Sequence, residues 1–306
     1  TGPIVAFSSA MRIHLTRSSF RWVVAASAVA ALSIIQPSAA QHKRAHLDNQ
    51  VQENMARGAA RTRVIVRVTP GTRGTLKALW RYRAGHSLKR EHGLLSALTM
   101  EIPTAAIDAL ARTPGVLSVS IDAPLQAHAV VPPTDGVLLQ QTLGYVPEDG
   151  LTGAGVGVGI VDSGLSPSAD FAGRITGFYD FTLRQGGNVA TAPTDPYGHG
   201  THVAGLVGGS GSMSDGLYRG VAPGVSLVGL RVLADDGSGY TSDVIEAVEF
   251  ATLNRAALGI DVLNLSLGHP PFESPATDPL ILAVNRATAA GIVVVVSAGN
   301  AGINPA

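Results

Sequence analysis

Short apolar runs alternate with amphipathic segments along the second half of the chain. The runs predict strands, at residues 156–162, 226–232, 260–268 and 292–296. Helices are predicted between or beside them, starting at residue 199 and spanning 243–251 and 280–290. The run at 292–296 is apolar at every position, which predicts a fully buried strand. Strands that alternate with helices predict an α/β fold with a doubly wound parallel sheet.

An earlier region has its own, different pattern. Strand-like runs at 64–68, 97–102 and 116–121 are separated by segments that can form helices, around 76–82 and 104–110. With a strand pair between the helices, the order is strand, helix, strand, strand, helix, strand. This order predicts a small α+β, ferredoxin-like sheet with two helices on one face. Three histidines of the region, His86, His92 and His128, have no ligand-like spacing and are predicted to lie on the surface.

The N-terminal segment has the features of a targeting signal. Three arginines follow Met11 and precede an uncharged stretch, residues 22–35, of 14 residues. That is shorter than the roughly 20 residues a membrane-spanning helix needs. Small residues at 37–40 resemble a cleavage site, so residues 1–40 are interpreted as an upstream extension and a secretory signal peptide. The alternative is a buried helix. The signal predicts a secreted protein without a membrane anchor.

Composition and charge narrow the classes of function. The chain has no Cys among 306 residues, which excludes disulfides, thiol nucleophiles and Cys-ligated zinc. Its formal net charge is zero, so nothing general points to nucleic acid as a partner. The charge is unevenly distributed: residues 41–128 carry 13 Lys and Arg against 6 Asp and Glu, whereas residues 129–306 carry 6 against 16. We expect the two regions, at +7 and −10, to attract each other.

Candidate catalytic groups follow the predicted strands. Asp162 ends an apolar strand, and the carboxyl ends of strands are where α/β sheets gather catalytic groups. Taken alone, it is also a residue that turns use. His199 begins a helix rich in small residues, which predicts close packing, and the helix dipole there favours a neutral imidazole. His202 does not complete an H-E-x-x-H zinc motif and is predicted to be packed or hydrogen-bonded in the helix.

Other acidic residues have simpler interpretations. Asp243 and Glu246 have the D-x-x-E spacing of a helix capping box. Asp235 and Asp236 lie in a turn; a structural Ca²⁺ there is one alternative, and solvated turn carboxylates are favoured. No cofactor is expected to be required for catalysis.

Five motifs then occur in a fixed order: Val161–Gly164, Gly198–Gly205, Gly220–Pro223, Asn264–Gly268 and Ser297–Asn300. The series resembles that of the subtilisin family of serine proteases and covers most of residues 150–306. The resemblance implies an incomplete subtilisin-like catalytic domain over 129–306. By element order and position, residues 41–128 resemble the inhibitor-type propeptide of that family.

The resemblance also implies roles for individual residues. Asp162 would orient the imidazole of His199, which would act as general base and then as general acid. The side-chain amide of Asn300 would donate to the oxyanion. Substrate binding by pairing with an extended chain is implied for three consecutive residues, Ser266, Leu267 and Gly268. The implied protein is a secreted endopeptidase that cleaves polypeptide substrates, with residues 41–128 as its intramolecular inhibitor and chaperone.

The family's nucleophile is a serine in a Gly-Thr-Ser motif downstream of the oxyanion Asn. Six residues follow Asn300 and none is Ser, so the serine is expected beyond Ala306 and this chain alone is expected to be inactive. The alternative is a truncated or pseudoprotease product that acts only through binding by its propeptide. The extended, proline-containing segment His128–Pro132 is predicted to be the site of self-processing.

Overall fold

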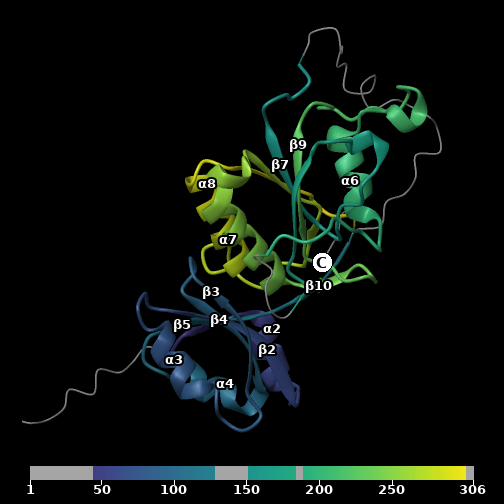
Figure 1. Cartoon of the computed structure of the whole chain (residues 1–306). Helices are drawn as coiled ribbons and strands as arrows, with labels where there is room; N and C mark the ends of the chain where they lie inside the picture. Colours follow the sequence, from purple (N-terminus) through teal and green to yellow (C-terminus); the bar gives the residue numbers. More distant parts are fainter. Residues whose placement is uncertain (1–43, 128–150, 184–188, 301–306) are drawn as a thin grey trace, which may run out of the picture. The chain divides into compact units, whose positions relative to one another are not determined.

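The computed structural model describes residues 44–127, 151–183 and 189–300, and Lys43–Ala306 form one compact unit (Figure 1). The predicted signal peptide and the predicted processing site at His128–Pro132 lie outside the described residues. Within the described ranges, no helix combines the length and the apolar character that crossing a bilayer requires.

A parallel sheet forms the centre of the second region, which confirms the predicted fold class. Its strands run in the order β13-β11-β7-β9-β8, and every neighbouring pair is parallel. The bounds are β7 Gly157–Asp162, β8 Ile175–Asp180, β9 Ser226–Arg231, β11 Val262–Leu265 and β13 Val293–Val296. All six residues of the central strand β7 are buried. Asp162 therefore lies at the carboxyl edge of the sheet, in its middle.

Helices cover both faces of this sheet (Figure 1). They are α6 His199–Gly208, α7 Thr241–Leu258 and α8 Pro279–Ala289. On one face, Val158 and Ile160 of β7 share a core with Ala204 of α6. On the other face, Val161 joins the core that α7 and α8 help to form. Burial on both faces explains why β7 is apolar or glycine at every position before Asp162.

The N-terminal region forms a second sheet with the order β1-β5-β2-β4-β3. The strands are β1 His46–Leu47, β2 Arg61–Val68, β3 Ser87–His92, β4 Ala97–Pro103 and β5 Val116–Ile121. The helices are α2 Asn49–Ala56, α3 Arg73–Trp80 and α4 Ile107–Ala111, and their apolar residues share one core with one face of the sheet. From β2 to β5 the elements follow the order predicted from the sequence; β1 and α2 were not predicted.

A small third sheet joins the two regions. Strand β6, Pro124–Ala127, lies between β10, Ser238–Tyr240, and β12, Leu267–Gly268, and is antiparallel to both. Apolar contacts continue the junction, because Ile65 of β2 and Leu125 of β6 belong to the same buried cluster as the residues of α7. The extended strand at the end of the first region is therefore built into the second.

Two strand predictions were wrong in detail. The predicted strand 260–268 is divided, because β11 ends at Leu265 and β12 begins at Leu267, where the chain turns to pair with β6. The strand at 292–296 is not fully buried: Val293, Val295 and Val296 are exposed. Within the described residues β13 pairs with β11 alone, so it lies at an edge of the sheet and only part of its surface meets the core.

Two predictions for single side chains were also wrong. His92 is fully buried; its Nε2 lies 2.8 Å from the hydroxyl of Thr99, and burial lowers the pKa of His92 to about 3, so the ring is neutral. His202, at the other extreme, is exposed on α6. In both cases the outcome depends on which face of the element meets the core, which the spacing of the histidines does not reveal.

Candidate active site

Asp162 and His199 come together at the carboxyl edge of the parallel sheet. The Nδ1 atom of His199 lies 2.6 Å from Oδ1 of Asp162. Asp162 is completely buried, and the imidazole is only 7% exposed. The same carboxylate oxygen accepts a hydrogen bond of 2.7 Å from the backbone N–H of Ser163. A neutral imidazole in this geometry donates its Nδ1 proton to the carboxylate, which orients the ring and assigns proton exchange to Nε2.

The start of α6 explains why these side chains can meet. The helix begins at His199 after Gly198, whose φ of 92° is in the left-handed region that favours glycine. A Cβ atom on Gly200 would lie 2.1 Å from the carbonyl oxygen of Gly164 and 3.0 Å from Cβ of Asp162. The helix therefore touches the loop after β7 through the backbone of Gly200, as the small residues of the motif predicted.

Asp195 supports this arrangement and was missed in the sequence analysis. One of its carboxylate oxygens accepts from the hydroxyl of Ser163 at 2.8 Å and from the N–H of Gly198 at 2.9 Å. The other accepts from the N–H and the hydroxyl of Thr201, at 2.7 and 2.6 Å. Asp195 thus caps α6 and ties it to the residue after Asp162. An Asp a few residues ahead of a helix start is the signal that could have identified it.

The other candidate residues follow neighbouring strands. Asn300 is exposed and lies four residues after the end of β13. Ser266 separates β11 from β12, and Leu267 and Gly268 form β12 itself. Since β13, β11 and β7 are parallel neighbours, these residues follow the same edge of the sheet as Asp162.

Strand β6 is an extended segment that is held by main-chain pairing on both sides, to β10 and to β12. Ala127 pairs with Leu267, and Gln126 pairs with both Gly268 and Ser238. Leu125 is buried among apolar residues of the second region. An extended chain held by main-chain pairing on both sides, with an alternate side chain buried, is the geometry of recognition by strand addition.

The turn at 235–236 carries the two carboxylates for which a structural Ca²⁺ was the alternative interpretation. In the described ranges, no group of three or more His, Asp or Glu side chains comes together in a way that could hold a metal ion. Asp235 pairs with Arg231, and Asp236 accepts from the N–H and hydroxyl of Ser238 at 2.9 and 2.6 Å. Both carboxylates of the turn thus have partners within the chain.

The predicted capping box of α7 was wrong. The helix begins at Thr241, and its N–H groups are capped from another region: Asp122 accepts from the N–H of Ser242 at 2.8 Å and from its hydroxyl at 2.9 Å. Asp243 and Glu246 instead form ion pairs with Arg90 of the N-terminal region. The expected attraction between the two oppositely charged regions thus has specific contacts in the structure.

Comparison with known proteins gives a consistent family. Residues 153–306 match the model of the subtilase family. Serine protease AprX of Bacillus subtilis (strain 168) is 45% identical over 157 residues, which are 50% of this chain and 34% of that protein. Alkaline elastase YaB of Bacillus sp. (strain YaB) is 34% identical over 215 residues, which are 70% of this chain and 52% of that protein.

A solved structure extends the similarity of fold. Fervidolysin from Fervidobacterium pennivorans, a keratinolytic enzyme related to subtilisin, matches with a TM-score of 0.64 over 85% of this chain and 42% of its own. At 18% identity this match shows the fold alone. This chain spans about a third to a half of the length of the curated relatives it matches.

Proposed function

Because this chain belongs to the subtilase family of serine proteases, we propose that it is part of a secreted endopeptidase that cleaves polypeptides with Asp162 and His199. The observation that carries this proposal is the 2.6 Å contact between His199 Nδ1 and Asp162 Oδ1 at the carboxyl edge of the sheet. A buried carboxylate that orients an imidazole is the pair a hydroxyl nucleophile requires.

In the proposed mechanism, Nε2 of His199 takes the proton of a serine hydroxyl as that oxygen attacks the substrate carbonyl. Asp162 stabilises the imidazolium that forms and remains ionised itself. The proton then passes from Nε2 to the leaving amine, which leaves an acyl group on the serine. Water hydrolyses this ester: Nε2 takes a proton from the water and returns it to the serine oxygen as the acid product leaves. Asn300 is proposed to donate its side-chain amide to the oxyanion, a contact worth about 3–4 kcal/mol in subtilisin itself. The serine is proposed to follow Ala306 in the full-length protein.

Residues 41–128 are proposed to act as the propeptide, both inhibitor and folding aid, and residues 129–306 as the first part of the catalytic domain. The pairing of β6 between β10 and β12 supports this assignment. A strand in that position blocks the pairing of Ser266, Leu267 and Gly268 with a substrate chain. Self-processing near His128–Pro132, secretion after removal of residues 1–40, and catalysis without a cofactor complete the proposal.

The test is peptide-bond hydrolysis by the full-length protein, followed with a fluorogenic polypeptide substrate and an active-site-directed fluorophosphonate probe. We expect His199→Ala to abolish both hydrolysis and labelling. Asp162→Asn should lower kcat by about 10⁴, because the imidazole then loses its correct tautomer. Hydrolysis that survives His199→Ala would contradict the proposal. A full-length wild-type protein that takes up no probe would favour the alternative, a pseudoprotease that acts only by binding.

A further inference from the structure

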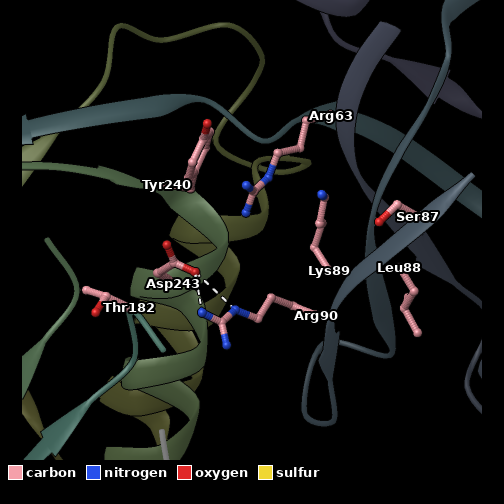
Figure 2. Close-up of a pocket in the computed structure, with 8 residues that line it drawn as sticks. All are labelled: Arg63, Ser87, Leu88, Lys89, Arg90, Thr182, Tyr240 and Asp243. Atoms are coloured by element: carbon pink, nitrogen blue, oxygen red, sulfur yellow. Dashed lines mark hydrogen bonds and ion pairs between the residues drawn. The ribbon is translucent and has the colours of Figure 1, made fainter. Parts of the chain in front are cut away.

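The side chain of Arg90 leaves its own sheet and enters the second region. Arg90 belongs to β3, and its side chain reaches Asp243 of the second region (Figure 2). The side chain is only 9% exposed. Its Nε and Nη2 atoms lie 3.0 and 2.8 Å from Oδ1 of Asp243, and Nη1 lies 2.8 Å from Oε2 of Glu246. The carbonyl oxygen of Leu183 accepts from Nη1 at 3.2 Å, and that of Phe181 accepts from Nη2.

The four residues that face Arg90 all belong to the second region, and we call them the Arg90 site: Phe181, Leu183, Asp243 and Glu246. The first three accept hydrogen bonds from the guanidinium, and Glu246 forms an ion pair with it. They surround the planar guanidinium so that all three of its nitrogens are bonded. A fork of fixed donors suits this arrangement, whereas the three N–H groups of a lysine ammonium diverge from a single nitrogen and do not reproduce it. The geometry is therefore selective for guanidinium as well as for positive charge.

The other cations beside the Arg90 site have partners of their own. A cavity of about 380 Å³ next to it is lined by both regions, with Arg63 and Lys89 on its N-terminal side (Figure 2). Arg63 pairs with Asp122 and lies over the ring of Tyr240, at 3.6 Å from its centroid. Lys89 lies 2.8 Å from Glu101 within its own sheet. Of these three cations, Arg90 is the one that enters the acceptor set.

The two carboxylates depend on this cation. Burial raises the pKa of both Asp243 and Glu246, even though Arg90 lies beside them. Desolvated carboxylates of this kind are unfavourable without a partner, and removal of one member of a buried ion pair is strongly destabilising. Loss of Arg90 thus leaves a preformed set of acceptors with a strong preference for a cation of the same shape.

We infer that Phe181, Leu183, Asp243 and Glu246 form a guanidinium-binding site, filled in this chain by Arg90, which accepts an arginine side chain of another polypeptide once the N-terminal region has left. The occupancy by Arg90 and the shape of the acceptor set carry the first part. The second part rests on the proposed function, in which residues 41–128 are removed. An arginine-bearing polypeptide would then compete with the N-terminal region for the same contact.

The experiment is chemical rescue in the full chain. Arg90→Ala removes Cγ, Cδ and the guanidinium of the side chain, and ethylguanidinium supplies the same set of heavy atoms. We expect low-millimolar ethylguanidinium to raise the Tm of Arg90→Ala by several degrees in a saturable manner. The wild-type chain, whose site is filled, should show no rise. Ethylammonium, with the same charge and without the fork, should have little effect on either protein.

Two further variants test the location of the effect. Rescue should be lost in Arg90→Ala/Asp243→Asn and retained in Arg90→Ala/Glu101→Gln, which removes a carboxylate outside the site. If Arg90→Ala is recovered unfolded, refolding yield replaces Tm as the readout for the same two compounds. Equal effects of ethylguanidinium and ethylammonium, or rescue that survives Asp243→Asn, would overturn the inferred site.

A last arm separates the site from the proposed function. The processed full-length protein is titrated with a short peptide that contains one arginine and with the same peptide containing lysine. Preferential binding of the arginine peptide, weakened by Asp243→Asn, supports the second part of the inference. Rescue in the full chain without peptide binding would retain the guanidinium site and reject its use after processing.

Discussion

The Asp162–His199 pair and the Arg90 site both bury a carboxylate beside a nitrogen-bearing side chain, and they are built in different ways. The first lies within one sheet–helix unit, where backbone N–H groups and a glycine contact bring the two side chains together. The second joins Arg90 to residues far away in sequence, with Phe181 91 residues and Asp243 153 residues from it. A pair that polarises a reactive group needs a rigid local frame, whereas a contact between two regions needs only strong, shape-selective acceptors.

The largest expected effect concerns the rigid frame. Gly200→Ala places a Cβ atom 2.1 Å from the Gly164 carbonyl oxygen, so α6 must move away from Asp162. We expect a loss of about 3 kcal/mol or more in the free energy of unfolding, measured by urea denaturation. Gly205→Ala is the matched control in the same helix, because its Cβ would meet nothing within 4 Å. It should stabilise the protein by about 0.5–1 kcal/mol. Equal effects of the two variants would argue against close backbone packing at this site.

The buried carboxylate of Asp48, in the N-terminal region, makes the stability of the fold depend on pH. Asp48 caps α2 by accepting from the N–H of Val51 at 2.6 Å, and it also accepts from the N–H of Ile121. Its side chain forms no ion pair within hydrogen-bond distance among the described residues, and burial raises its pKa from 3.8 to about 6. The folded state therefore binds the proton more tightly than the unfolded state.

Asp48 therefore stabilises the folded state more at low pH than at neutral pH. The stabilisation linked to Asp48 is fully present below about pH 4 and is lost as the pH rises to about 6, at a cost of up to about 3 kcal/mol. Asp48→Asn keeps an acceptor oxygen and removes the titration. The difference in unfolding free energy between wild type and Asp48→Asn should thus change between pH 4 and pH 6.5 in favour of the variant. A constant difference across that range would contradict the raised pKa.

A smaller effect is expected at Asp195, which accepts hydrogen bonds from Ser163 and Gly198, the residues next to Asp162 and His199. Asp195→Asn turns an NH₂ group toward donors whose hydrogen bonds the carboxylate oxygens now accept. We therefore expect a loss of about 2 kcal/mol in the free energy of unfolding. Thr201→Val, which removes one hydroxyl donor from the same network, should cost about 1 kcal/mol. In addition, Asp195→Asn should shift the NMR signals of the His199 ring. If Asp195 acted on the helix cap alone, these signals would not change.

The smallest effect is expected at Glu246, on the exposed side of the Arg90 site. Its side chain is 30% exposed, and Arg90 keeps Asp243 and two carbonyl oxygens when Glu246 is changed. Glu246→Gln should therefore cost about 1 kcal/mol, and the loss should decrease with added salt. Asp243→Asn, at the buried side, is the reference variant and should cost more. If Glu246→Gln lowered the free energy of unfolding more than Asp243→Asn, Glu246 and not Asp243 would be the main partner of Arg90.

The pairing of Asp162 with His199 was implied by the family resemblance, and the structure has the two side chains in contact. The parallel sheet and the element order of the N-terminal region were predictable from the residues themselves. The physical reason is that these features depend on local patterns. Apolar runs form strands that are buried on both faces, a carboxylate at the end of a central strand lies at the sheet edge, and small residues at a helix start allow close approach. Each of these rules acts within a few residues of the group concerned.

The partners of the charged residues depend instead on how distant elements pack. Asp243 and Glu246 have the spacing of a capping box, and yet Asp122, some 120 residues earlier, caps the helix while they bind Arg90. His92 is buried because its strand turns it toward Thr99. Partners of this kind are set by which faces of distant elements meet, since the desolvation of a charge must be offset by whatever lies opposite it in the folded chain.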